Sequence, residues 1–517
     1  RSHFGSSVVF SLGMSSLRFA IPCLVGAALV LFVVRRKFVR RETLNVDQHS
    51  DESDVEEGVA LEDLSAPSTG QGQSRGHVRR RPTSGRPGPL AKVHVKSFGC
   101  SHNTSDAEFM AGLLQEYGYQ LVDSVDEADL CLYNSCTVKN PSQEAVVNLV
   151  QSAANKQKGV VLAGCVPQGD RSVAGVHQAS LLGVTQIDRV VEVVEETLKG
   201  NRVVLLAKKA LPSLDLPKIR HNRLVEIVPV NTGCLGNCSY CKTKHARGTL
   251  GSYTKAAVLK RIKDAIEDGI TQVWLTSEDL GAYGLDIGTN IAELLDEIVQ
   301  ILPKHVMLRL GMTNPPYMLQ HVKSLGRVLQ HPQVFEFLHV PVQSGSDKVL
   351  HKMVREYTVQ DFDALVEGIQ QYVPHATIAT DVICGFPSET EQDHQETLEL
   401  LKRWQLPAVN ISQFYPRPGT PAASMTKLDS RTVKQRSREV TELFNSYSTT
   451  ERLRGSTVLV WFDEFDLKRS QIVGHTKQYT KVVVPALGPE ALGSCRMVKV
   501  VDTSKWHVVG KLVGSAT

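Results

Sequence analysis

The stretch EIVPVNTGCLGNCSYCKTKHARG, residues 226–248, determines how the rest of the sequence is interpreted. It opens with an apolar run typical of a buried strand, and three cysteines follow on the next loop. Cys234, Cys238 and Cys241 have the spacing CxxxCxxC, and no fourth cysteine comes close behind them. Structural zinc sites close four ligands and usually pair them as CxxC units, so this spacing favours a 4Fe–4S cluster with one iron left free.

The residues around these thiols fit that interpretation. Gly233, Gly236 and Ser239 are small, which suits a backbone that wraps closely around a cluster. A zinc ion held by the three cysteines and completed by His245 is the alternative. The position of the loop favours the cluster, because the loop follows the first strand of a repeated βα pattern.

Apolar runs alternate with amphipathic segments between residues 225 and 425. Strands are predicted at residues 226–234, 272–279, 305–312, 335–345, 376–386 and 407–416. The alternation predicts a partial or complete parallel βα barrel, in which ligands gather at the carboxyl ends of the strands. Polar clusters follow the strands there, at residues 276–279, 343–345 and 385–387. Ser277, Glu278 and Gln343 are candidates for contacting a cofactor, and each could equally cap a helix or join a hydrogen-bonded rim.

A second βα region precedes the barrel, and three of its predicted strands end in a cysteine. These strands are residues 91–100, 128–136 and 158–165, which end at Cys100, Cys136 and Cys165. Because parallel strands end at one edge of a sheet, we expect the three thiols to converge on one rim. Buried core thiols are the alternative, and we assign Cys131 to the core. Ser105 and Glu108 have the spacing of a capping box at the start of the first helix.

The last segment, residues 451–517, changes to short strands with turn signals and is predicted to form a small β-barrel. It carries ten Lys or Arg against six Asp or Glu. With Tyr479 and Trp506 available for base stacking, this basic barrel is predicted to bind RNA. A β cap without a ligand is the alternative.

The N-terminal residues differ from the rest of the chain because they combine an uncharged apolar run with a charged segment. Residues 1–41 are predicted to be a membrane anchor built on the uncharged run at 19–34, which as a helix would extend about 24 Å against a bilayer core of about 30 Å. Five of the six flanking positive charges follow the run, so the positive-inside rule leaves the other domains in the cytosol, and we expect the endoplasmic reticulum membrane. Residues 42–91 read as a disordered charged linker.

Length and composition limit the number of domains and the class of protein. The chain has 517 residues, of which 42% are hydrophobic and 22% charged, which predicts two or three domains with large cores. Ten cysteines in such a length exclude a small disulfide scaffold. The net charge of +4 permits a nucleic-acid partner and does not require one.

Around its three-cysteine loop the sequence resembles the radical S-adenosylmethionine (SAM) enzymes. In that family the free iron of the cluster binds the amino and carboxylate groups of SAM, and an electron from the cluster splits SAM into a 5′-deoxyadenosyl radical. The resemblance implies that Cys234, Cys238 and Cys241 hold this cluster. Ser277, which follows the second barrel strand, would then lie near the SAM amino group.

The order of three regions narrows the resemblance to the methylthiotransferases. Residues 92–205 resemble their Rossmann-like N-terminal domain, residues 220–450 the radical SAM partial TIM-type barrel, and residues 451–517 a TRAM domain. The expected fold class is therefore α/β with a small C-terminal β-barrel. In that family the N-terminal cysteines hold a second 4Fe–4S cluster that handles sulfur. The resemblance thus implies three auxiliary ligands, namely Cys100, Cys136 and Cys165.

Local sequence points to one branch of the methylthiotransferases. The segments SFGCSHNTSDAEFMAG (97–112), LTSEDLGAYG (275–284) and HVPVQSGSDKVLHKM (339–353) resemble the archaeal and eukaryotic members that act on threonylcarbamoyladenosine. The resemblance implies methylthiolation of carbon 2 of that base at tRNA position 37, with SAM, an electron donor and a sulfur donor, by a monomer. Eukaryotic members carry their membrane helix after the TRAM domain, whereas the apolar run here comes first.

Three alternatives to this activity stay open. The first two keep the chemistry and change the acceptor to isopentenyladenosine in tRNA or to an aspartate of a ribosomal protein. The third is a non-catalytic zinc protein that binds nucleic acid through its basic barrel.

Overall fold

The computed structural model describes residues 90–137, 140–170, 173, 175–485 and 487–513. The predicted anchor at 1–41 and almost all of the predicted linker at 42–91 lie outside these residues. Within the described ranges, no helix has the length and apolar character needed to cross a membrane. The predicted location, anchored in the endoplasmic reticulum membrane, was therefore wrong on this finding and is withdrawn.

The first domain is built on a six-stranded sheet in the order β2-β1-β3-β4-β5-β6. Every neighbouring pair of strands is parallel. Its strands are β1 (Lys92–Ser97), β2 (Gln120–Leu121), β3 (Leu130–Ser135), β4 (Gly159–Gly164), β5 (Ser180–Leu182) and β6 (Val204–Leu205). Its helices are α1 (Ser101–Tyr117), α2 (Asn140–Asn155), α3 (Cys165–Gly169) and α4 (Val190–Leu198). Strand β3 is buried along its whole length, as expected for a parallel sheet covered by helices.

Helix α1 begins earlier than the sequence predicted, so the capping-box prediction was wrong. Cys100 is the N-cap and makes no side-chain capping bond, which leaves Ser105 and Glu108 inside the helix. Both side chains instead join the helix to the barrel. The Ser105 hydroxyl donates to the Ile227 carbonyl at 3.1 Å, and the Glu108 carboxylate lies 3.0 Å from Lys218 Nζ. Burial of these groups against the barrel therefore outweighs the local capping preference.

The middle of the chain forms an open parallel barrel, as predicted. Two three-stranded sheets, β11-β10-β7 and β12-β13-β14, are linked by single parallel bridges such as Met312 to His339. The strands are β7 (Val225–Pro229), β10 (Gln272–Thr276), β11 (Met307–Arg309), β12 (Phe337–His339), β13 (Thr377–Cys384) and β14 (Ala408–Gln413). A short pair, β8 (Asn231–Thr232) and β9 (Gly251–Ser252), follows the first of these strands.

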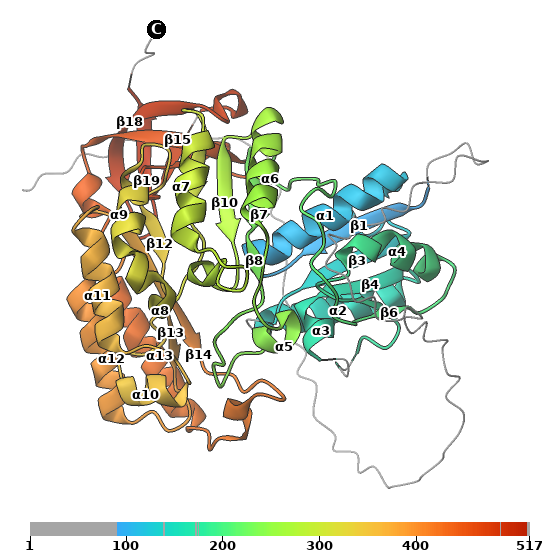
Figure 1. The fold of residues 1–517 in the computed structure, drawn as a ribbon, viewed down its shortest axis with the longest axis horizontal. Coiled ribbons are helices and arrows are strands. Elements are labelled where there is room, and N and C mark those ends of the chain that lie inside the picture. The colour runs from blue at the N-terminus through green and yellow to red at the C-terminus, as the bar shows by residue number, and fades with distance from the viewer. Residues whose placement is uncertain (1–89, 138–139, 171–172, 174, 486, 514–517) are drawn as a thin grey trace, which may run out of the picture. The chain divides into compact units, whose positions relative to one another are not determined.

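Helices run outside these strands, where Figure 1 shows α6, α7, α9, α11 and α12 one beside another. The larger helices are α6 (Lys255–Glu267), α7 (Ile291–Ile301), α9 (Val322–Gln330), α11 (Val359–Gln370), α12 (Glu391–Trp404) and α13 (Ser430–Asn445). The short helices are α5 (Thr243–Arg247), α8 (Pro315–Met318) and α10 (Asp347–Lys352). Helix α1 of the first domain packs against β7, so the two domains meet along the first barrel strand (Figure 1).

The last domain is a closed five-stranded barrel in the order β15-β16-β17-β19-β18, which confirms the predicted small β-barrel. Its strands are β15 (Thr457–Asp466), β16 (Gln471–His475), β17 (Lys481–Pro485), β18 (Cys495–Thr503) and β19 (Val508–Leu512). Alternate residues such as Val460, Phe462 and Val498 fill its core.

Tyr479, one of the two aromatic residues expected to stack on RNA, lies between two domains instead. The Tyr479 ring packs against Phe335 and Phe337 of the βα barrel, with ring centroids 4.9 Å and 5.1 Å apart. The prediction that Tyr479 is free to stack on bases was therefore wrong, because this ring joins two domains. Trp506 is 62% exposed, and its proposed contact with RNA stays a prediction.

Candidate functional site

A cavity of about 490 Å³ opens at the carboxyl ends of the strands, and residues of both α/β domains line it. All six cysteines that were predicted to bind clusters line this one cavity: Cys100, Cys136, Cys165, Cys234, Cys238 and Cys241. Cys131, by contrast, is fully buried in the core of the first domain, as predicted. The parallel topology therefore brings together two sets of thiols that lie more than 60 residues apart in the sequence.

The N-terminal thiols follow three neighbouring strands, β1, β3 and β4. Gly99 precedes Cys100 with φ +100°, and a Cβ on Gly99 would lie 2.5 Å from Cys136 Sγ, so only glycine fits this approach. A hydrogen bond from Cys136, together with the charge of Arg247, outweighs burial and lowers the pKa of the Cys100 thiol to about 6. Burial, by contrast, raises the pKa of the Cys165 thiol to about 12.

The loop with Cys234, Cys238 and Cys241 is fixed to the segment after α10. Ser239 donates from its backbone N–H to the Met353 carbonyl at 2.9 Å and from its hydroxyl to the Lys352 carbonyl at 2.9 Å. The Arg355 guanidinium lies 3.0 Å from Cys238 Sγ. Two backbone carbonyls therefore hold the loop in place through Ser239, and the Arg355 cation lies beside one of its thiols.

His245, the fourth ligand of the zinc alternative, does not line the cavity with the three thiols. Gly236 lies beside two of these thiols: a Cβ on it would be 3.7 Å from Cys234 Sγ and 3.9 Å from Cys238 Sγ, which is ordinary van der Waals contact. In the described part of the chain, no three His, Cys, Asp or Glu side chains are arranged to hold one ion. His245 is exposed and is not among the residues that line the cavity. A zinc site completed by His245 therefore does not fit, whereas a 4Fe–4S cluster spreads its thiolates over several irons.

Arg247 follows one set of cysteines in the sequence and contacts residues beside the other set. It ends helix α5, just after the loop of Cys241, and its side chain is almost fully buried in the first domain. Its guanidinium donates to Asn103 Oδ1 at 2.7 Å and to Asp106 Oδ2 at 2.7 Å. The Cys165 thiol lies 3.5 Å from the same Asn103 oxygen. One buried cation thus connects the end of one cysteine loop with the surroundings of the other.

Glu278, a candidate for contacting SAM, forms part of this network. Its carboxylate lies 3.0 Å from His102 Nδ1 and 3.1 Å from Arg247 Nε. Burial opposes the charge on Glu278, but His102 and Arg247 outweigh it and hold the pKa of the carboxylate below its usual value. Glu278 lines the cavity, yet its main partners are the two cations of the domain junction.

The other two candidates also line the cavity. The Ser277 hydroxyl is buried and has no hydrogen-bond partner within the described residues, so it is available to a ligand. Gln343 has φ +68°, a strained conformation for a residue other than glycine. Its backbone bonds to β13 through the Asp381 carbonyl at 2.8 Å, which leaves its side chain at the cavity wall.

Asp279, next in sequence, organises the wall beside the loop of Cys238. Its carboxylate accepts from the Asn314 side chain at 2.7 Å and from the Thr313 hydroxyl at 3.2 Å. Burial raises the pKa of Asp279 to about 6, against the effect of these hydrogen bonds. Asn314 in turn accepts a hydrogen bond from Arg355, so the chain of contacts ends at the cation beside Cys238.

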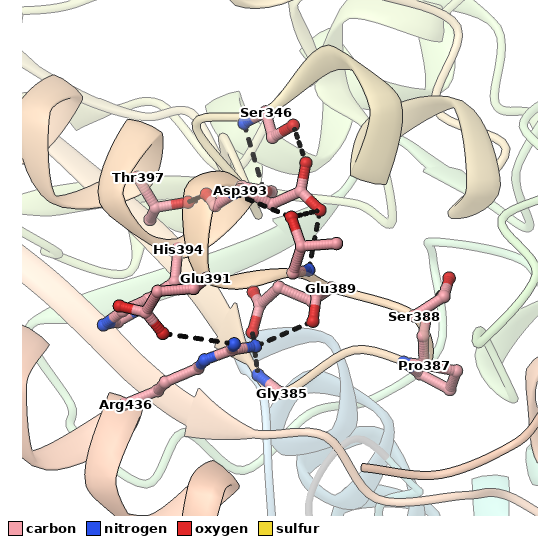
Figure 2. Close-up of polar contacts among 12 residues, drawn as sticks. Ser346, Gly385, Pro387, Ser388, Glu389, Glu391, Asp393, His394, Thr397 and Arg436 are labelled. Atoms are coloured by element: carbon pink, nitrogen blue, oxygen red, sulfur yellow. Dashed lines mark hydrogen bonds and ion pairs between the residues drawn. The ribbon is translucent and has the colours of Figure 1, made fainter.

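The third polar cluster, at residues 385–387, does not line the cavity. Phe386 is fully buried, and the polar groups nearby hold the loop in place (Figure 2). The Gly385 N–H donates to Glu389 Oε2 at 2.9 Å, and Arg436 donates to the same oxygen at 2.7 Å. Thr390 and Asp393 form a capping box at the start of α12. This cluster therefore stabilises the end of β13.

Sequence reasoning missed Arg247, Arg355 and Asn314. Each lies in or beside a segment that was quoted for other residues, but no spacing rule marks a single arginine or asparagine as part of a site. Their roles depend on contacts between residues more than 30 positions apart, which only the fold reveals. The six cysteines had a spacing or a strand end to identify them.

Two family comparisons divide the chain in the same way as the structure. Residues 92–181 match the uncharacterized protein family UPF0004. Residues 228–401 match the radical SAM superfamily. A solved structure of the radical SAM methyltransferase TsrM from Kitasatospora setae is similar with a TM-score of 0.48 and 16% identity, covering 65% of this chain and 75% of that chain.

Curated relatives extend over most of the chain. The threonylcarbamoyladenosine tRNA methylthiotransferase of Drosophila pseudoobscura pseudoobscura is 49% identical over 82% of this chain and 77% of its own length. The protein of the same name from Homo sapiens is 48% identical over 83% of this chain and 75% of its own. A probable threonylcarbamoyladenosine tRNA methylthiotransferase from Pyrococcus horikoshii is 34% identical over 82% of this chain and its whole length.

Proposed function

We propose the function of this chain from the premise that it belongs to the threonylcarbamoyladenosine tRNA methylthiotransferase family, which confirms the resemblance found in the sequence. The chain is a radical SAM transferase that modifies tRNA. Its reaction replaces the hydrogen on carbon 2 of N6-threonylcarbamoyladenosine at position 37 with a methylthio group. The product is 2-methylthio-N6-threonylcarbamoyladenosine. The observation that carries the proposal is the single cavity lined by both sets of cysteines.

The radical SAM superfamily implies one 4Fe–4S cluster and SAM, and we propose that the chain holds two clusters. Cys234, Cys238 and Cys241 would hold the cluster that cleaves SAM. The auxiliary cluster would be held by Cys100, Cys136 and Cys165. What supports this assignment is that all six thiols line one cavity and that Cys100, Cys136 and Cys165 follow three neighbouring parallel strands. When bound, the clusters supply an electron for the cleavage of SAM and a site for sulfur.

The residues of the chain arrange these centres around a shared chamber. Arg355 keeps a positive charge beside Cys238, and Arg247 holds the two cysteine loops together through Asp106 and Asn103. The free Ser277 hydroxyl is placed to bind a polar group of SAM. The cavity lies at the junction of two domains, so residues of both can contact the substrate and the cofactors.

We propose that tRNA reaches the cavity with the target base flipped out of the anticodon loop, as RNA readers that act on single bases require. The C-terminal barrel would hold the RNA through exposed side chains such as Trp506, Lys468 and Lys499. The reaction also needs an electron donor and a sulfur donor.

Nucleoside analysis in cells tests the proposal. Cells that lack their own enzyme of this kind should contain N6-threonylcarbamoyladenosine in their tRNA without its 2-methylthio form. Expression of this chain should restore the 2-methylthio nucleoside, measured by liquid chromatography and mass spectrometry of digested tRNA. Restoration of 2-methylthio-isopentenyladenosine instead, or of a methylthio-aspartate on a ribosomal protein, would replace this acceptor with one of the alternatives.

A further inference from the structure

Arg309 is a cation of the cavity that forms no ion pair with any residue in the described part of the chain. It ends β11 and lines the same cavity as the six cysteines. Its guanidinium lies over the rings of Trp274 and Phe337, 4.8 Å from each centroid, and over the ring of Tyr479, 4.9 Å from its centroid. Its Nε is buried without a hydrogen-bond partner, and no carboxylate among the described residues forms an ion pair with it.

The acidic side chains around the cavity are engaged elsewhere. Each of the four acids that line it has a partner other than Arg309. These pairs are Glu278 with Arg247, Asp279 with Asn314, Glu356 with Tyr317, and Asp381 with His339. None of these four carboxylates forms an ion pair with Arg309. The charge of this guanidinium is available to whatever enters the cavity.

An aromatic cage of this kind holds a guanidinium while leaving its in-plane donors free. Ring faces attract the cation, and they offer no acceptor to the N–H groups at its edge. The Arg309 Nε is buried without an acceptor, and such an unpaired donor is costly, so the site favours a ligand that brings an acceptor with negative charge. The group that matches the planar fork of arginine is a carboxylate, which accepts two parallel hydrogen bonds.

We propose that Arg309 binds the carboxylate of the threonyl group on the target base and thereby selects threonylcarbamoyladenosine over unmodified adenosine. This inference rests on the proposed function. Two carboxylates can enter the cavity, that of the threonyl group and that of the methionine part of SAM. The methionine end of SAM belongs beside the loop of Cys238, where Arg355 already lies 3.0 Å from the thiol. Arg309 stands instead among rings from β10, β12 and the C-terminal barrel, which favours the substrate.

Neighbouring groups suit the rest of the threonylcarbamoyl substituent. His339 and Asp381, 3.0 Å apart on β12 and β13, line the same cavity. They offer polar partners for the threonyl hydroxyl and the carbamoyl N–H. Arg309, His339 and Asp381 can thus bind a ligand with one negative charge and several hydrogen-bonding groups. The threonylcarbamoyl substituent of the substrate has these groups, and unmodified adenosine lacks the substituent.

Direct binding tests the inference without any turnover. The cluster-loaded protein is titrated with three fluorescent anticodon stem–loops that carry threonylcarbamoyladenosine, its methyl ester or unmodified adenosine at position 37. The wild-type protein should bind the first about 10- to 100-fold more tightly than the ester, because the ester removes one charge-assisted pair. Arg309→Gln should bind all three RNAs about equally, and Arg309→Lys should keep part of the preference. Arg403→Gln, which removes an exposed guanidinium outside the cavity, should behave like the wild type.

The outcomes separate this inference from the proposed function. If the wild type does not prefer threonylcarbamoyladenosine over adenosine, the proposed substrate fails first. If the wild type shows that preference and Arg309→Gln retains it, or the ester binds as well as the acid, the role of Arg309 is refuted. If Arg309→Gln leaves the RNA preference intact and weakens SAM in calorimetry, the carboxylate is that of the cosubstrate, which also overturns the inference. The comparison of acid with ester uses wild-type protein and holds even if Arg309→Gln does not fold.

Discussion

Replacing Glu226 with Gln should destabilise the junction between the first domain and the barrel by about 3 kcal/mol near neutral pH. Glu226 lies on β7 with its side chain fully buried, 2.9 Å from Lys218 Nζ, 3.1 Å from Arg261 Nε and 2.5 Å from Arg220 Nε. Burial opposes the charge, but Lys218, Arg261 and Arg220 outweigh it and lower the pKa of Glu226 from 4.5 to about 2. That difference in pKa corresponds to about 3 kcal/mol of stability.

The sign of the pH dependence follows from this lowered pKa. A carboxylate whose pKa is lower in the folded state than in the unfolded chain stabilises the fold above its unfolded value and loses that effect as the pH falls. The contribution of Glu226 should therefore be complete above pH 4.5 and be lost as the pH approaches 2. The free-energy difference between the wild type and Glu226→Gln should shrink across this window, because a protonated carboxyl resembles the amide.

Urea denaturation followed by circular dichroism at several pH values between 3 and 7 measures this difference. Glu293→Gln serves as the control, because Glu293 pairs with Lys255 at the surface and should contribute little. A wild-type advantage below about 1 kcal/mol at pH 7 would show that the three cations do not stabilise Glu226 as described. A difference that stays constant from pH 7 to pH 3 would refute the ionic origin of the effect.

Three further predictions follow from the site. Arg247→Gln removes one of the two cations, Arg247 and His102, that face the buried carboxylates of Asp106 and Glu278, and it should cost about 3–5 kcal/mol in urea denaturation. A cost below about 1 kcal/mol would mean that the network does not hold the domains together. Arg436→Met should lower the stability of the barrel by a similar about 3–5 kcal/mol and leave the iron content of purified protein unchanged; loss of iron would contradict a purely supporting role. Cys238→Ala should abolish SAM cleavage and retain the N-terminal cluster, and Cys136→Ala should do the opposite; if both variants lose both signals, the assignment of the two clusters is wrong.

Spacing and strand ends identified the cysteines of the site from the sequence. CxxxCxxC is a local pattern, and Cys136 and Cys165 each follow a mainly apolar strand, so their common edge could be predicted from parallel topology. The same argument placed Ser277 and Gln343 on the cavity wall, where the structure has them. These features depend on periodicity and chain order, which a single sequence contains.

Contacts between domains could not be predicted in this way. Ser105 and Glu108 matched a capping box, but burial against the barrel gave them other partners. Tyr479 looked free for stacking, although its loop inserts it among Phe335 and Phe337. Such outcomes depend on which surfaces meet when three domains pack together, and no local pattern in the sequence contains that information.

Transfer of deuterium from the substrate tests the central claim most directly. A tRNA anticodon stem–loop is prepared with N6-threonylcarbamoyladenosine deuterated at carbon 2 of the adenine, and it is incubated with cluster-loaded protein, SAM, a reductant and sulfide. Mass spectrometry should find 5′-deoxyadenosine that carries one deuterium, together with the 2-methylthio nucleoside. Formation of 5′-deoxyadenosine without deuterium while the methylthio nucleoside accumulates would contradict radical attack at carbon 2 inside this cavity.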